Sequence, residues 1–198
     1  RRAAAYEELM RGRIAASEWE RTYASPISAE AHDTAFITEC ALEFPRRQSV
    51  DTPFVCHVSY VDPHDPYDPP EPYASRFDPS AMPDPLPAEW EEQGPECLSS
   101  VQSNYLKFER IANDPAAVRR LRASYHGQLR LLDDQIGRLI AELEASELWE
   151  NTVVVFSTDH GEHLGDHGMI AKGFAHYDAG IRCPLIVGGG APAVETLR

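Results

Sequence analysis

The sequence predicts an α/β fold with a mostly parallel central sheet flanked by helices, and three features of the chain support this. A long helical pattern over residues 113–149 leads directly into the apolar run NTVVVFS at 151–157. Two further runs, PFVCHVSYV at 53–61 and RCPLIVGGG at 182–190, have the length and composition of buried strands. Alternating helices, buried strands and Gly-rich loops are typical of α/β proteins, whose ligands bind beyond the carboxyl ends of the strands.

Two helices are predicted from apolar spacing and from residues that favour helix ends. Residues 27–44 follow Ser25 and Pro26 and place apolar side chains close to helical spacing. The longer helix opens with Asp114 as the expected N-cap and Pro115 as the first helical residue. Its apolar residues recur at intervals of three and four, which makes it amphipathic: Val118, Leu121, Tyr125, Leu132, Ile136, Leu139, Ile140 and Leu143.

The length of 198 residues suits one α/β domain or a large part of one, and a hydrophobic content of 42% suffices for a core. Residues 77–112 are rich in Pro and acidic residues, with weak periodicity. We therefore expect a long surface loop or insertion there, which either covers a site or is a plain excursion of the chain.

The net charge of the chain limits the classes of partner that it can bind. It carries 32 acidic and 18 basic side chains, for a formal net charge of −14. Such an excess repels nucleic acid phosphates and anionic lipid headgroups, so we expect neither nucleic acid nor membrane as a partner. An anionic substrate would need a metal ion or a few well-placed cations in order to bind.

The cysteines and the first residues of the chain bear on its thiol chemistry and its location. The widely spaced Cys40, Cys56, Cys97 and Cys183 form no CxxC pair, and we interpret them as free buried thiols. No stretch has the roughly 18 apolar residues needed to span a bilayer. The sequence opens at an Arg, so we expect the true N-terminus and any targeting signal to lie upstream, and we favour a cytoplasmic location.

The segment FSTDHGEHLGDHG at 156–168 concentrates metal-capable residues at a strand end. Asp159 and His160 come first after the strand and offer the mixed oxygen and nitrogen ligation that divalent cations accept. An isolated Asp-His pair is more often a solvated strand end. His160, His163 and His167 would share a helical face, as in a zinc site, but Gly161 and its neighbouring glycines disfavour a helix there. A zinc hydrolase is therefore a secondary hypothesis.

Two further residues are candidates for chemistry. His64 stands in DPHDPY, where prolines on either side restrict the backbone, so its imidazole could act as a general acid toward a leaving group. A surface histidine is the alternative. Lys172 is one of few cations in an acidic surrounding and could neutralise an anionic ester oxygen, or could simply be solvated. The loops 62–73 and 157–176 both follow predicted strands and can meet at one edge of the sheet.

The order of these motifs resembles the sulfatases of the alkaline phosphatase superfamily. The chain has LLDDQIGRL, then an apolar strand, then STDHGE, GDH, KG and RCPLI, and upstream it has PHDPY after a strand. The resemblance covers about residues 28–190. The pair Asp-His, in place of Asp-Asn, resembles the pattern of the branch that contains phosphonate monoester hydrolases and choline-sulfatase-like enzymes. The resemblance to the family implies an alkaline-phosphatase-like sandwich, of which residues 1–198 would form the middle and C-terminal part of one catalytic domain.

The resemblance also implies roles for individual residues. Asp159 and His160 would bind a catalytic Ca²⁺ or Mn²⁺, Lys172 would contact sulfate or phosphonate oxygens, and His64 would assist departure of the alcohol. A formylglycine made from Cys or Ser would be the nucleophile. Three residues would shape the loop around the metal ligands: His163, Asp166 and His167. Gly161, Gly165 and Gly173 would permit its turns.

The chain departs from the family pattern in three ways. Asp178 stands where Glu is more frequent, and Cys183 replaces an aliphatic residue before Pro184. More important, no Cys or Ser lies in the Cys/Ser-x-Pro/Ala-x-Arg segment that carries the nucleophile. We therefore expect the nucleophile, and a strand with further acidic ligands, in an N-terminal part not included here, and we expect the isolated chain to be inactive.

The resemblance implies hydrolysis of a small-molecule sulfate monoester by the parent protein. A phosphonate or phosphate ester hydrolase of the same superfamily is the first alternative, since both esters are tetrahedral anions. A sulfatase relative that binds a ligand or serves as a subunit without catalysis is the second. A homo-oligomer is compatible with these residues.

Overall fold

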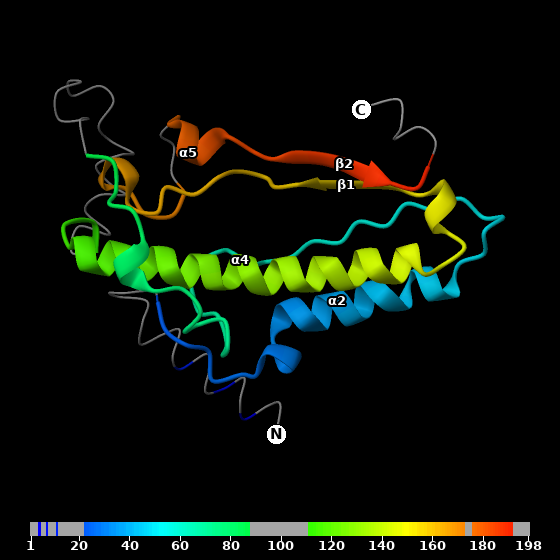
Figure 1. The fold of residues 1–198 in the computed structure, drawn as a ribbon, viewed down its shortest axis with the longest axis horizontal. Coiled ribbons are helices and arrows are strands. Elements are labelled where there is room, and N and C mark those ends of the chain that lie inside the picture. Colours follow the sequence, from blue (N-terminus) through cyan, green and yellow to red (C-terminus); the bar gives the residue numbers. More distant parts are fainter. Residues whose placement is uncertain are drawn as a thin grey trace.

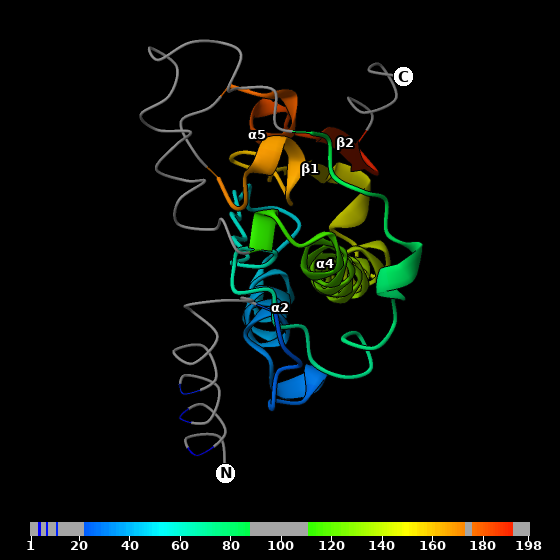
Figure 2. The same cartoon turned by 90° about the vertical axis from the view of Figure 1, so that its left-hand side faces the viewer.

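A computed structural model describes residues 22–87, 111–172 and 176–191, together with Ala4, Glu7 and Arg11. Two helices, α2 (Asp33–Glu43) and α4 (Pro115–Glu144), pack against each other. The strands β1 (Val153–Ser157) and β2 (Leu185–Gly189) lie above both helices in the two views of Figures 1 and 2. A short helix, α5 (Asp178–Ile181), precedes β2, and 3-10 turns complete the described elements.

The start of α4 confirms the sequence prediction. Asp114 is the N-cap, its carboxylate accepts the Ala116 N–H at 2.9 Å, and Pro115 occupies the first helical position. α2 begins later than expected, because residues 29–31 form a 3-10 turn and His32 takes the N-cap position, where its ring nitrogen accepts the Thr34 N–H. Short side chains at Thr34, Ala35 and Thr38 are buried on α2 and allow close packing.

The core lies along the first half of α4. Tyr67, from the loop after residue 61, is fully buried there and meets Val118 and Leu121 of the helix and Ile170 and Ala171 of the later loop. The chain can approach α4 closely because position 127 is Gly: a Cβ there would lie 2.7 Å from the Tyr73 carbonyl oxygen. Both loops that carry candidate residues are therefore seated on the same helix.

The sheet differs from the prediction. β1 and β2 pair antiparallel, with Val155 opposite Val187, and they form the one sheet of the residues that the structure describes. A parallel pair needs a long crossover, usually a helix. Between these strands the described chain has only short helical segments and turns back through α5. The expectation of a parallel sheet is thus not met by this pair, although both strands lie where the sequence predicts them.

The strand predicted at 53–61 is also absent from the structure. This segment is extended and crosses the view between β1 and α4 (Figure 1), but none of its residues joins a ladder with another described strand. Val55 is 94% exposed, and Val153 and Val155 of β1 are exposed too, so the prediction of a strand buried on both faces is wrong for β1 here. The described residues include no neighbour that covers these apolar side chains.

Two smaller predictions concern cysteines and the long loop. Cys40, Cys56 and Cys183 are free, as expected, but they are exposed rather than buried. Cys97 and residues 88–110 of the expected 77–112 loop lie outside the described residues. Within the described part of the chain, no helix is long and apolar enough to cross a membrane.

Candidate active site

The Asp159-His160 pair lies directly after β1 and presents two donor atoms to a common region. The His160 N–H donates to Asp159 Oδ1 at 3.0 Å, which fixes the carboxylate. His160 Nδ1 lies 2.8 Å from the Gly161 carbonyl oxygen, and since a carbonyl only accepts, this nitrogen carries the ring proton. Nε2, the other ring nitrogen, lies 3.5 Å from Asp159 Oδ2.

This arrangement fits a divalent cation. A metal-binding His commonly donates its other ring N–H to a backbone carbonyl, which orients the ring. The Asp159 side chain is 85% exposed, so its oxygen can be reached from outside. No group of three or more His, Cys, Asp or Glu side chains that could hold a metal ion occurs among the described residues, so a cation bound by this pair would need further ligands.

Gly161 connects the segment that carries Asp159 and His160 to α5. Its N–H donates to the Gly180 carbonyl at 2.9 Å, and a Cβ at this position would lie 2.0 Å from the Ala179 carbonyl oxygen. Only Gly allows so close an approach of two backbones. Gly161 was predicted to permit a turn, but it is not among the glycines with positive φ, and the close approach to α5 is what requires glycine here.

Arg122 of α4 organises the turn at 164–168. Its Nη2 contacts Asp166 Oδ1 at 2.6 Å, and its Nε donates to the Leu164 carbonyl at 2.9 Å. Asp166 Oδ1 also accepts the Leu86 N–H at 2.8 Å, which joins the 83–87 segment to this turn. Gly165 has φ of +94°, a left-handed conformation that favours glycine, so its predicted role in the turn is confirmed. Gly173 lies outside the described residues.

His163 and His167 face Tyr177 rather than the Asp159-His160 pair. The His167 ring stacks on Tyr177 with a centroid distance of 4.0 Å, and the His163 ring meets it edge-on at 6.2 Å. His163 is buried, neither ring nitrogen has a hydrogen-bond partner among the described residues, and burial lowers its pKa. Because the chain from His160 to His167 is not α-helical, the zinc-site hypothesis finds no support in these positions.

His64 is held by its own loop. Its Nδ1 lies 2.6 Å from the Asp65 carbonyl oxygen and 3.3 Å from Asp65 Oδ1, so Nδ1 carries a proton and the imidazole presents Nε2 as its other nitrogen. The His64 side chain is 45% exposed and the Asp65 side chain 9%. The Asp65 carboxylate is therefore a negative charge close to the Nδ1 side of the His64 ring.

The two loops meet through Tyr67 and Glu162. Burial raises the pKa of the Glu162 carboxyl, while the Leu164 N–H and the Tyr67 hydroxyl act against that rise. Burial, and then the Glu162 charge, raises the pKa of Tyr125 to about 12. The rings of Tyr67 and Tyr125 are in edge contact at 5.8 Å. The loop with His64 and the loop with Asp159 therefore share one buried polar and aromatic junction.

Lys172 is exposed at the end of the described stretch 111–172. It follows Ala171, which has φ of +60°, and Leu164 and His167 are left-handed as well. Such conformations are unfavourable for residues other than Gly and tend to cluster at functional sites.

The sequence did not point to Arg122 or Glu162. Arg122 is a polar residue on the buried stripe of the helix, next to the apolar Leu121. This position could have marked it as a candidate from the sequence.

The family model described as Sulfatase matches residues 5–190 of this chain. The multifunctional alkaline phosphatase superfamily protein PehA of Trinickia caryophylli is 30% identical over 175 residues, covering 82% of this chain and 34% of that protein. An arylsulfatase of Clostridium perfringens is 32% identical over 156 residues, covering 79% and 32%. The solved phosphonate monoester hydrolase of Agrobacterium radiobacter superposes with a TM-score of 0.71 at 27% identity, covering 91% and 37%. The chain thus spans about a third of the length of these relatives.

Proposed function

Because the chain belongs to the sulfatase family, we propose that the protein of which it forms part hydrolyses a small-molecule sulfate monoester with the help of a divalent cation. The observation that carries this proposal is the Asp159-His160 pair, whose Oδ2 and Nε2 atoms lie 3.5 Å apart while Nδ1 is engaged by a carbonyl. One carboxylate oxygen and one neutral imidazole nitrogen suit Mn²⁺, and Ca²⁺ is the alternative.

Asp159 and His160 would hold the cation, and a bound divalent cation would supply positive charge to the ester oxygens and so lower the barrier to attack. Lys172 adds a positive charge for the non-bridging oxygens. A formylglycine of the kind that the family resemblance implies would supply the nucleophile. The cation would need further ligands, since no group of three or more metal-capable side chains occurs among the described residues.

His64 provides the proton for the leaving group. As the bond between sulfur and the bridging oxygen breaks, its electron pair goes to that oxygen, and the proton on His64 Nε2 goes to the same atom, so that a neutral alcohol departs. Asp65 supports this role, because its carboxylate lies 3.3 Å from His64 Nδ1 and stabilises the imidazolium before transfer.

The test is binding of Mn²⁺ to the full protein, measured by titration calorimetry. Asp159→Asn keeps the shape of the side chain but removes its charge, and we expect it to weaken Mn²⁺ binding about 10-fold or more, as loss of a ligand's support does in metal sites. Asp133→Asn is the control, since Asp133 is an exposed carboxylate on α4 that pairs with Arg130. Equal affinity of both variants would contradict the metal role of Asp159.

Phosphonate monoester hydrolysis is the second candidate. It is favoured by the superposition on the Agrobacterium radiobacter enzyme, with a TM-score of 0.71. Turnover of phenyl sulfate and of a phenyl phosphonate ester by the same preparation separates the two reactions. A binding subunit without catalysis is the third, and it would follow if the full protein had no Cys/Ser-x-Pro/Ala-x-Arg segment.

A further inference from the structure

The loop that carries His64 is held at both of its ends by one side chain. Asp62 lies two residues before His64, and Pro66 lies two residues after it. The Gln128 amide nitrogen donates to Asp62 Oδ1 at 3.2 Å and to the Pro66 carbonyl at 3.2 Å. Gln128 therefore connects the beginning and the end of the loop.

The orientation of this amide follows from its partners. A carboxylate and a carbonyl both accept hydrogen bonds, so Nε2 of Gln128, with two protons, must face them. Gln128 is fully buried in the middle of α4. The loop is thus fixed to a long, rigid helix.

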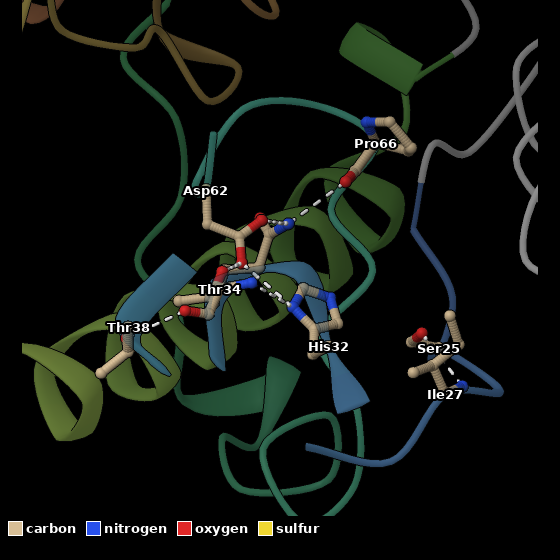
Figure 3. A network of polar contacts seen from close by, with 8 residues as sticks. Ser25, Ile27, His32, Thr34, Thr38, Asp62 and Pro66 are labelled. Atoms are coloured by element: carbon tan, nitrogen blue, oxygen red, sulfur yellow. Dashed lines mark hydrogen bonds and ion pairs between the residues drawn. The ribbon is translucent and has the colours of Figure 1, made fainter. Parts of the chain in front are cut away.

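The second oxygen of Asp62 is anchored to α2 (Figure 3). The Thr34 hydroxyl donates to Asp62 Oδ2, and His32 Nδ1 lies 3.6 Å from the same oxygen. Thr34 lies in the first turn of α2, where the helix dipole favours a negative charge. The Thr38 hydroxyl in turn donates to the Thr34 carbonyl at 2.9 Å. Asp62 is therefore held between the start of α2 and the middle of α4.

We propose that Gln128 is a positioning residue for His64, acting through Asp62 and the Pro66 carbonyl to hold the imidazole where it can protonate the leaving oxygen. This inference rests on the proposed function, in which His64 supplies that proton. A proton donor must lie within hydrogen-bond reach of its target, and a displacement of about 1 Å can lower the rate about 100-fold. A backbone tied at residues 62 and 66 limits such displacement at residue 64.

The test compares two esters that differ in their need for a proton. The 4-nitrophenolate ion leaves readily without one, whereas phenolate depends on protonation. In the full protein, we expect Gln128→Met to lower kcat for phenyl sulfate by about 10- to 100-fold, with little change for 4-nitrophenyl sulfate. Gln135→Met is the matched control, because Gln135 is also buried on α4, two turns later, and contacts Arg138 of its own helix.

Gln128→Leu is a second variant in case Gln128→Met does not fold. It is close to Gln in size and removes the donor without placing a new charge beside Asp62, so the same selective loss is expected. A merely structural role would lower stability and reduce turnover of both esters equally, which would overturn the proposal. Melting temperatures of both variants, measured alongside Gln135→Met, identify that outcome.

His64→Ala separates this proposal from the one on which it rests. We expect His64→Ala to show the same selectivity between the two esters, and addition of Gln128→Met to cause no further selective loss. If His64→Ala is selective and Gln128→Met is not, the role of Gln128 is refuted while that of His64 stands. If His64→Ala itself is not selective, the proton role of His64 is wrong, and the positioning role falls with it.

Discussion

The Arg122→Met variant tests whether the turn at 164–168 depends on one buried guanidinium. Arg122 is 9% exposed at its side chain and Asp166 is 24% exposed. Besides its bond to Asp166, Arg122 donates to the carbonyls of Leu164, Pro83 and Asp84 at 2.9, 3.0 and 3.3 Å. Met keeps the apolar stem of the side chain and removes all four contacts.

The magnitude follows from burial. Removing one partner of a buried ion pair costs about 3–5 kcal/mol, and partial exposure of Asp166 reduces this, so we expect Arg122→Met to lower the free energy of unfolding by about 2–4 kcal/mol. Arg119→Met is the control on the same helix. The Arg119 side chain is 31% exposed and pairs with Asp84, which is 75% exposed. Exposed pairs contribute at most about 1 kcal/mol.

Urea unfolding followed by circular dichroism measures both variants against the parent protein. Arg122→Lys should fall between Arg122→Met and wild type, because Lys retains the charge facing Asp166 but cannot reach three carbonyls from one planar group. The reasoning is refuted if Arg122→Met and Arg119→Met lower stability by the same amount.

Three further predictions concern other parts of the structure. Gly161→Ala should weaken Mn²⁺ binding in a calorimetric titration, because the added Cβ would lie 2.0 Å from the Ala179 carbonyl oxygen. Gly137→Ala on α4 is the contrasting variant: its Cβ would have no atom within 4 Å, so it should raise the unfolding midpoint. Burial lowers the pKa of His163, so the unfolded chain takes up the proton first; stability in urea should therefore fall as the pH drops below about 6.5, and His163→Phe should reduce that fall. The isolated chain, with Val55 and Leu185 exposed, should bind the dye ANS more strongly than the full protein does.

Local features of the fold could be predicted from the sequence because neighbouring residues determine them. Asp114 and Pro115 set the start of α4 through one side chain and one fixed backbone angle, and both act within a single turn. Strand direction and burial depend on distant partners. The segment 53–61 has strand composition, yet it forms no ladder with the described strands.

In the candidate site, too, some residues are marked by their neighbours in the sequence and others depend on distant partners. Asp159 and His160 were singled out through the family resemblance and their position after a strand, and the structure places them just beyond the end of β1, while their metal role stays a prediction. The roles of Asp62 and Gln128 could not, since these residues are 66 positions apart and nothing local marks them as partners. One general signal was present: Gln128 and Arg122 are polar residues on the buried stripe of an amphipathic helix, where a polar side chain must find a partner. That signal indicates importance without naming the contact.

The central claim is that Asp159 and His160 hold a cation that is needed to hydrolyse a sulfate ester. The most direct test is turnover of 4-nitrophenyl sulfate by the full protein after chelation and re-addition of Mn²⁺ or Ca²⁺, in wild type and in Asp159→Asn. We expect activity to disappear with the chelator, to return with the cation, and to be lower by about 100-fold or more in the variant. Undiminished turnover in Asp159→Asn, or in chelated wild type, would contradict the account.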